Sequence, residues 1–166
     1  MAATVFMFLL AGTVSVVLGV DLRVSLYDSQ TYPPSAYKNK LYYLSRTTYN
    51  NYDQASYWCA WNGGGYPAEV DSTPELAFLE QYLVVTAPST AMVYISGTDA
   101  RIDGRWLSQR TGSPLIIFDW APGEPNNSGG REDCLEMWLK NQARFNDGPC
   151  TNAPENRYVL CEKDLF

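Results

Sequence analysis

The segment EPNNSGGREDC, residues 124–134, combines carboxylates and amides with turn-forming proline and glycine. A second segment, FNDGPC at residues 145–150, adds another amide and another carboxylate. Together the two segments supply a set of oxygen ligands: Glu124, Asn126, Glu132, Asp133, Asn146 and Asp147. A calcium ion accepts about six to eight hard oxygen ligands in irregular geometry. The two segments therefore predict a calcium (Ca²⁺) site that also binds a ligand.

The residue composition narrows the metal chemistry. The chain has no histidine, which excludes a zinc or iron site built from imidazole. Its four cysteines are an even number, and the apolar start of the chain is typical of export, so we expect disulfide bonds rather than a metal cluster. Sequence alone leaves the pairing of the four cysteines open.

The ends of the chain predict one exported domain. With 166 residues, of which 46% are hydrophobic, the chain can bury one core and is too short for two. Residues 1–19 are apolar and end in Val17-Leu18-Gly19, which fits signal-peptide cleavage. A signal anchor is the alternative, because about 20 apolar residues could also span a bilayer. We expect a signal peptide at 1–19, a short N-terminal segment at 20–39, a folded domain at 40–163 and a secreted, extracellular protein.

Charge and side-chain chemistry exclude several classes of function. The formal net charge of −6 argues against nucleic acid or an anionic membrane as partner, since phosphate binding needs clustered Lys and Arg. We expect no membrane insertion after signal removal. The pair Glu132-Asp133 could act as acid and base, but the chain lacks His and shows no Ser or Cys nucleophile arrangement. We therefore expect no enzyme activity.

Two helices are predicted in the first half of the chain. At residues 52–61, Tyr52, Ala55 and Cys59 fall on one helical face, and the glycines at 63–65 end the helix. The second helix begins at the capping box Ser72-Thr73-Pro74-Glu75, followed by an apolar stripe.

Short apolar runs elsewhere predict strands and one long loop. The strands are expected at residues 40–45, 92–96, 105–108, 115–120, 134–139 and 157–162. Tyr32-Pro33-Pro34-Ser35 is expected to be a turn or an extended linker. Residues 111–133 have little regular pattern, and a loop of that length favours a functional role.

An ordered set of motifs resembles the C-type lectin-like domain, in particular its calcium- and sugar-binding members. The resemblance covers about residues 40–163. It rests on Cys59, Gly64, Ala68, Ser72, Glu75, Tyr94-Ile95-Ser96-Gly97, Gly104-Arg105-Trp106, FDWAPGEPN at 118–126, Glu132-Asp133-Cys134, Asn146-Asp147, Cys150 and Cys161-Glu162-Lys163. Tyr94 and Phe145 stand where the family usually has Trp. Both keep an aromatic ring where the core needs bulk, so we expect the fold to survive.

The resemblance implies a fold, a disulfide pairing and two metal sites. The fold is α+β, with two helices, mixed antiparallel sheets and a long calcium-binding loop, in the short form of the domain. The implied disulfides are Cys59–Cys161 and Cys134–Cys150. The implied ligands of the principal calcium ion are Glu124, Asn126, Glu132, Asn146 and Asp147, with a cis peptide bond before Pro125. A possible auxiliary calcium site would use Asp99, Asp103, Asn127 and Asp133, sharing Glu132.

The implied ligand is a sugar with vicinal hydroxyls. Each hydroxyl can donate a hydrogen bond to a carboxylate, Glu124 or Glu132, and accept one from an amide, Asn126 or Asn146. In the family, Glu-Pro-Asn goes with equatorial hydroxyls, hence mannose, N-acetylglucosamine, glucose or fucose, while Gln-Pro-Asp goes with galactose. We expect Ser128 to lie beside the sugar, together with Arg131 and Asn141.

Two interpretations compete at the level of function. The first is a secreted calcium-dependent lectin of mannose-type preference that recognises glycans in innate defence. Because one such site binds weakly, a homo-oligomer is a possible partner arrangement. The alternative is an acidic calcium-binding structural or mineral-matrix protein on the same fold.

Two further features have alternative interpretations. Asn126-Asn127-Ser128 is also a glycosylation sequon, and a glycan on Asn126 would remove its amide from the calcium shell, so the two roles exclude each other. Trp106, Trp120 and Trp138 could stack on sugars, but we expect them to be structural.

Overall fold

The structure is a computed structural model that describes residues 30–155 and 157–166. The expected signal peptide at 1–19 and the first part of the segment at 20–39 lie outside these residues. Within the described part of the chain, no helix is both long and apolar enough to cross a membrane.

Both predicted helices are present, and their capping follows from the sequence. Helix α1, Tyr52–Gly63, begins at Asn51, whose side chain accepts hydrogen bonds from two backbone amides of the first turn, and it ends at Gly64 with φ of 65°. Helix α2, Thr73–Thr86, begins at Ser72, whose hydroxyl accepts from the amide of Glu75 at 3.3 Å.

The capping box of α2 differs from the predicted form in one contact. The Glu75 carboxylate accepts a hydrogen bond from the amide of Asp71 at 2.9 Å, one residue before the N-cap. The same carboxylate also accepts from the Tyr42 hydroxyl and lies 3.1 Å from Lys40 Nζ. Glu75 therefore connects the start of α2 to the sheet.

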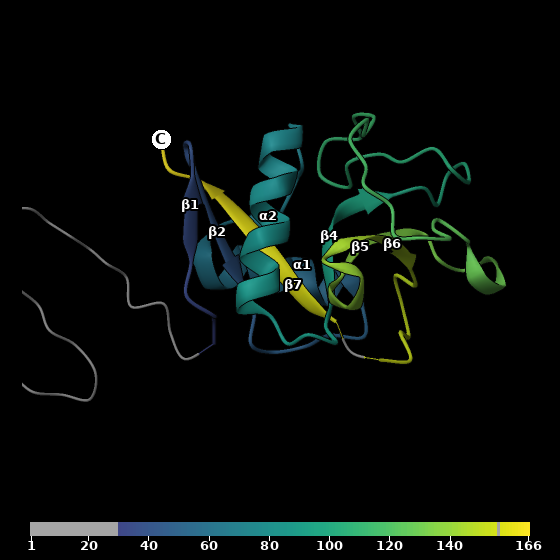
Figure 1. The fold of residues 1–166 in the computed structure, drawn as a ribbon, viewed down its shortest axis with the longest axis horizontal. Helices are drawn as coiled ribbons and strands as arrows, with labels where there is room; N and C mark the ends of the chain where they lie inside the picture. The colour runs from purple at the N-terminus through teal and green to yellow at the C-terminus, as the bar shows by residue number, and fades with distance from the viewer. Residues whose placement is uncertain (1–29, 156) are drawn as a thin grey trace, which may run out of the picture.

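Seven strands form one twisted arrangement on which the helices pack. The strands are β1 (Ser35–Tyr37), β2 (Lys40–Leu44), β3 (Tyr66–Pro67), β4 (Met92–Thr98), β5 (Cys134–Trp138), β6 (Arg144–Gly148) and β7 (Tyr158–Asp164). Their order is β1-β2-β7-β4-β5-β6, with β3 beside β7 (Figure 1). β4 and β7 pair in parallel and the other pairs are antiparallel. The predicted α+β fold is confirmed.

Two predicted strands are wrong, and three strands were not predicted. Residues 105–108 and 115–120 form only isolated bridges, Leu107 with Thr98 and Pro114, and Trp120 with Phe145. Turns at Gly104 and Gly112, with φ of 76° and 72°, interrupt the pairing, so these apolar runs pack as irregular chain.

The unpredicted strands are β1 and β6, at opposite ends of the strand order, and the two-residue β3 beside β7. The sequence of β1 follows a proline pair, and that of β6 contains the polar run Arg144 to Gly148, so neither shows an apolar alternation. β1 pairs on one side only, and β6 has just the isolated Trp120 bridge on its second side, so backbone register rather than side-chain pattern defines both strands.

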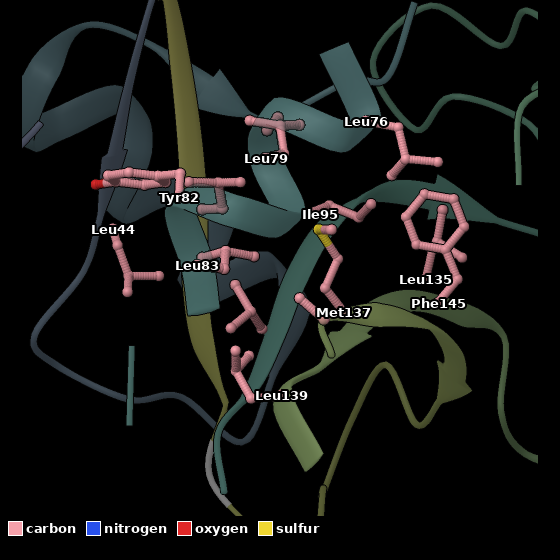
Figure 2. Close-up of a cluster of buried hydrophobic side chains, with 14 of the residues drawn as sticks. Leu44, Leu76, Leu79, Tyr82, Leu83, Ile95, Leu135, Met137, Leu139 and Phe145 are labelled. Carbon is pink, nitrogen blue, oxygen red and sulfur yellow. The ribbon is translucent and has the colours of Figure 1, made fainter. Parts of the chain in front are cut away.

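The core lies between α2 and the strands. Leu79 and Leu83 of α2 pack toward Ile95 and Met137 of the sheet, and Phe145 closes the end nearest the long loop (Figure 2). Phe145 is fully buried, so this aromatic fills the position where the family usually has Trp. Of the three tryptophans expected to be structural, Trp106 is buried, and Trp120 and Trp138 are half-buried.

The disulfides confirm the pairing implied by the resemblance. Cys59–Cys161 joins α1 to β7 across 102 residues of sequence and lies in a second buried cluster with Tyr43 and Trp58. Cys134–Cys150 spans 16 residues and joins the start of β5 to the segment after β6. The second disulfide therefore lies at the base of the long loop.

Candidate oxygen-rich binding site

β6 carries the residue that organises the site. Asp147 is buried, and its two carboxylate oxygens accept hydrogen bonds from the amides of Asn126 and Asn127, at 3.1 and 2.6 Å. The peptide bond between Glu124 and Pro125 is cis, as expected. The strand therefore holds the Glu-Pro-Asn turn of the loop directly against its own end.

The remaining residues of the expected principal set gather around this contact. Asn126 Nδ2 donates to Glu124 Oε2 at 2.5 Å, so these two side chains meet. The Glu132 carboxylate accepts from the amide of Ser128 at 2.7 Å, and Glu132 N donates to Asn127 Oδ1 at 3.3 Å. These contacts bend the loop between residues 127 and 132 back on itself.

Negative charge is concentrated at this point. Burial, a hydrogen bond to Asp147 and the charges of Asp147 and Glu132 together raise the pKa of Glu124 to about 7, although the hydrogen bond from Asn126 opposes the rise. Burial also raises the pKa of Glu132; the Asp147 charge adds to this rise, while a hydrogen bond from Ser128 N and the Arg157 charge oppose it. Asp147 is therefore close enough to Glu124 and Glu132 to disfavour the ionised forms of both glutamates.

This donor set fits calcium in charge and in ligand type. Three carboxylates and two amides offer only oxygen ligands, and a cation would relieve the repulsion among the acids. Among residues 30–155 and 157–166, no group of three or more Asp, Glu, His or Cys side chains could hold a metal ion by itself. The amides Asn126 and Asn146 would therefore have to complete the shell.

A buried ion pair lies under the ligand strand. Arg157 Nε donates to Glu136 Oε1 at 2.7 Å, and the two side chains are 4% and 0% exposed. The other Glu136 oxygen accepts from Asn146 Nδ2 at 3.5 Å, and Glu136 stands opposite Asn146 in the β5–β6 register. Asn146 Nδ2 also donates to the backbone carbonyl of Asp147. Glu136 therefore fixes one of the expected amide ligands.

Gly148 makes room for this ion pair. A Cβ atom at position 148 would collide with the Glu136 carboxylate, which leans across the strand into that space. Burial raises the pKa of Glu136 to about 7, although the charge and hydrogen bond of Arg157 oppose the rise. Only a small residue after Asp147 lets the carboxylate reach both Asn146 and Arg157.

The expected auxiliary site is partly assembled. Asp103 Oδ1 accepts from Asn127 Nδ2 at 2.9 Å, and Asp99 N donates to the carbonyl of Asp133 at 3.3 Å. Asp99 is buried; its Oδ2 accepts from Gly104 N at 2.8 Å, but its Oδ1 has no hydrogen-bond partner. Burial raises the pKa of Asp99, and the charges of Asp133 and Asp103 add to this rise. A buried carboxylate oxygen without a partner fits a bound cation.

Sequence reasoning missed Glu136 and Arg157. A signal for the first was available, because Glu136 is the one charged residue in the apolar run from Cys134 to Leu139. An acid inside a central strand pattern predicts a buried partner. Nothing near Arg157 in the sequence identifies it as that partner, since 21 residues separate the two.

The fold and the site define a small disulfide-bonded α+β domain with an oxygen-rich binding loop. The sequence model of the Lectin C-type domain matches residues 48–163, and the chain belongs to this family. Domains of this family generally bind calcium, and the family is one of binding domains, so the chain is not an enzyme.

Relatives and solved structures agree with this assignment. Pulmonary surfactant-associated protein D of Bos taurus is 35% identical over 104 residues, 63% of this chain and 26% of that protein. A C-type lectin mannose-binding isoform of Oxyuranus scutellatus is 32% identical over 116 residues, 68% of this chain and 72% of that protein. The chain spans about a quarter of the length of the surfactant-associated proteins.

The fold is also similar to that of a solved structure. The cow C-type carbohydrate-recognition domain of CD23, crystallised in the presence of a GlcNAc2Man3 oligosaccharide, superposes with a TM-score of 0.64. The sequence identity is 26%, over 79% of this chain and 92% of that chain.

Proposed function

We propose that this protein is a secreted lectin that binds neutral glycans of the mannose type in the presence of calcium. The calcium ligands would be Glu124, Asn126, Glu132, Asn146 and Asp147. The observation that supports this most strongly is the contact between Asp147 and the Glu-Pro-Asn turn. That contact gathers acids from two distant segments around one point.

Each side chain would have a defined role toward the sugar. A bound calcium ion would supply positive charge and vacant coordination positions for two hydroxyl oxygens. Glu124 and Glu132 would accept hydrogen bonds from these hydroxyls, and the amides of Asn126 and Asn146 would donate to them. The Asn126 amide already meets Glu124, so this donor and this acceptor face the same space.

The comparisons support the class of ligand. One relative is described as a mannose-binding isoform, and one similar structure was solved in the presence of a mannose-containing oligosaccharide. The auxiliary set of Asp99, Asp103, Asn127 and Asp133 would hold a second calcium ion and brace the loop. The mannose preference itself would follow from the order of acid and amide in the Glu124–Asn126 pair.

A sugar competition experiment tests the proposal. Immobilised mannose should retain the protein in calcium, and a chelator should release it. The double variant Glu124→Gln/Asn126→Asp reverses the positions of acid and amide, so its preference should shift toward galactose. A matched control, Glu155→Gln/Asn39→Asp, makes the same exchange at two exposed positions outside the site and should keep the mannose preference.

The contradicting results are distinct. A double variant that still prefers mannose would show that Glu124 and Asn126 do not select the sugar. Calcium binding that no monosaccharide affects would instead favour an acidic calcium-binding structural protein on this fold.

A further inference from the structure

Three adjoining hollows lead away from the calcium loop. The first, of about 440 Å³, is lined by Glu132 and Arg131 at one end and by Cys150 and Thr151 at the other. The second, of about 290 Å³, shares Cys150 and Thr151 and continues to Asp53. The first two hollows therefore adjoin at Cys150 and Thr151.

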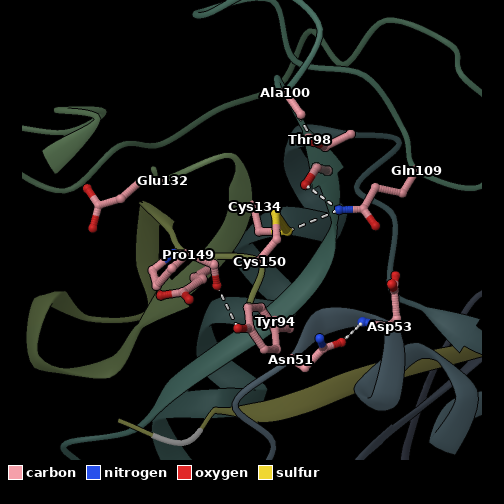
Figure 3. Close-up of a disulfide and its surroundings, with 12 residues drawn as sticks. Asn51, Asp53, Tyr94, Thr98, Ala100, Gln109, Glu132, Cys134, Pro149 and Cys150 are labelled. Atoms are coloured by element: carbon pink, nitrogen blue, oxygen red, sulfur yellow. Dashed lines mark hydrogen bonds between the residues drawn. A yellow bond between two sulfur atoms is a disulfide. The ribbon is translucent and has the colours of Figure 1, made fainter. Parts of the chain in front are cut away.

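A third hollow lies on the exposed face of helix α1, beside the second. This hollow, of about 450 Å³, shares Asp53 with the second and is lined further by Ser56, Tyr57 and Ala60. The extended groove, defined here as these three hollows, therefore runs from Glu132 to Tyr57. It passes over the Cys134–Cys150 disulfide, with Glu132 on one side and Gln109 on the other (Figure 3).

The walls of the extended groove are fixed by bonds within the protein. The Cys150 carbonyl accepts from Tyr52 N at 2.8 Å, which ties the disulfide to the start of α1. Asn51 Oδ1 accepts from Asp53 N at 2.8 Å (Figure 3). Gln109 Nε2 donates to the carbonyl of Gly97 at 3.2 Å and lies 3.3 Å from Cys134 Sγ. A ligand in this groove would meet a surface that needs little ordering.

The charges that line the extended groove nearly balance once calcium is bound. Its acids are Glu132, Asp133 and Asp53, and its cations are Arg131 and Arg157. Glu132 and Asp133 would be calcium ligands, and the buried Glu136 neutralises Arg157, so Asp53 and Arg131 remain as one acid and one cation. Hydroxyl and amide groups of Ser128, Thr151 and Asn152 provide the remaining polar lining of the first hollow. This lining suits a neutral, hydroxyl-rich chain.

An exposed aromatic ring stands at the far end. Tyr57 is 77% exposed and lines the third hollow next to Ser56 and Asp53. An exposed ring flanked by hydrogen-bonding groups can pack on the apolar face of a sugar ring while its neighbours bond to hydroxyls. Trp61, one helical turn further, is 91% exposed but lines none of the three hollows.

We infer that the extended groove binds the body of a neutral, linear oligosaccharide whose terminal residue occupies the calcium loop. This inference rests on the proposed function and adds the size and charge class of the ligand. Affinity would then grow with chain length, because each further residue is held against a surface already joined to the first.

The test compares oligosaccharide lengths in two matched variants. Titration calorimetry in calcium would measure mannose and a series of linear mannose oligosaccharides of increasing length. The ratio of oligosaccharide to mannose affinity should rise with length in the unaltered protein. In Tyr57→Ala this ratio should fall about fivefold for the longest chains, whereas Trp61→Ala should keep it. Thr151→Trp, which places bulk in the middle of the groove, should stop the rise at an intermediate length.

The outcomes separate the inference from the proposed function. Calcium-dependent mannose binding with no gain from chain length would overturn the groove and leave the proposed function standing. Equal losses in Tyr57→Ala and Trp61→Ala would also overturn it. Sulfated or uronic-acid oligosaccharides that bind more tightly than neutral ones of equal length would refute the charge class. No mannose binding at all would remove both proposals.

Discussion

Two clusters of charged side chains, one in each half of the molecule, have similar chemistry and different neighbours; the first is partly exposed at Asp71 and the second is buried. In the half formed by β1, β2, β7 and the helices, Lys40 Nζ lies 2.7 Å from Asp71, 3.1 Å from Glu75 and 3.2 Å from Glu162. This cluster joins α2 to the sheet. In the half that carries the long loop, Arg157 and Glu136 join β5 to the strand that carries Asn146 and Asp147.

The two clusters differ in whether they contact an expected calcium ligand. The Lys40 cluster supports helix packing, and none of its members contacts an expected calcium ligand. The Arg157–Glu136 pair touches Asn146 directly. We therefore expect damage to the first cluster to lower stability alone, and damage to the second to lower stability and calcium affinity together.

The largest effect should come from the disulfides that hold the two halves. Replacing Cys59 and Cys161 by Ser opens a link across 102 residues and should lower the free energy of unfolding by about 4–5 kcal/mol. Replacing Cys134 and Cys150 by Ser opens a link across 16 residues and should cost about 3 kcal/mol. Chemical denaturation measures both. A larger loss for the shorter link would contradict the division of roles.

Single replacements in the charged clusters should separate stability from binding. Arg157→Met and Lys40→Met each leave acids without their cation, and each should lower the free energy of unfolding by about 3 kcal/mol. Only Arg157→Met should also weaken calcium binding, by about tenfold, because Glu136, the partner of Asn146, is then no longer held by Arg157. Calorimetric calcium titration of the two folded variants measures this. Equal calcium affinities would refute a positioning role for Arg157.

A smaller effect concerns pH in the Lys40 cluster. Burial raises the pKa of Glu162 from 4.5 to about 7, although Lys40 opposes the rise. The folded protein therefore binds more protons than the unfolded chain between these values, so this carboxyl makes stability fall as pH increases from 4.5 to 7. Glu162→Gln should flatten that fall by on the order of 1 kcal/mol. Thermal unfolding across this pH range measures it, with exposed Glu155→Gln as control; an unchanged slope in Glu162→Gln would contradict the assignment.

The smallest effects should come from the helix caps. Ser72→Ala removes the N-cap of α2 and should lower the free energy of unfolding by about 1 kcal/mol without altering sugar affinity. Asn51→Ala should cost a similar amount, but it also frees the start of α1 beside the extended groove. We therefore expect oligosaccharide affinity to fall in Asn51→Ala and to stay unchanged in Ser72→Ala. A loss of affinity in both variants would contradict this and would show that lower helix stability alone weakens oligosaccharide binding.

The sequence predicted those parts of the fold that depend on local signals. The N-cap of α2 could be predicted, because the capping box at Ser72 is visible in the sequence. The N-cap of α1 could not, because Asn51 is one of several polar residues before that helix. The two false strands, at 105–108 and 115–120, have apolar residues but form only single bridges to β4 and β6 instead of a ladder. Pairing depends on residues far along the chain, which a local pattern does not contain.

The candidate site was predictable where residue types were sufficient. The oxygen-bearing side chains around Glu124 and Asp147 follow from the sequence, and the structure brings their segments together. The ion pair of Glu136 and Arg157 did not follow, because its members are joined only by the fold. The extended groove also depends on the fold, since α1 and the segment after β6 meet only in three dimensions.

The most direct test of the central claim is a crystal structure of the protein grown with calcium and mannose. The account predicts an ion bonded to oxygens of Glu124, Asn126, Glu132, Asn146 and Asp147, with two vicinal mannose hydroxyls completing its shell. A structure in which calcium and mannose occupy another part of the surface, while Asn126 and Glu124 contact only water, would contradict the account.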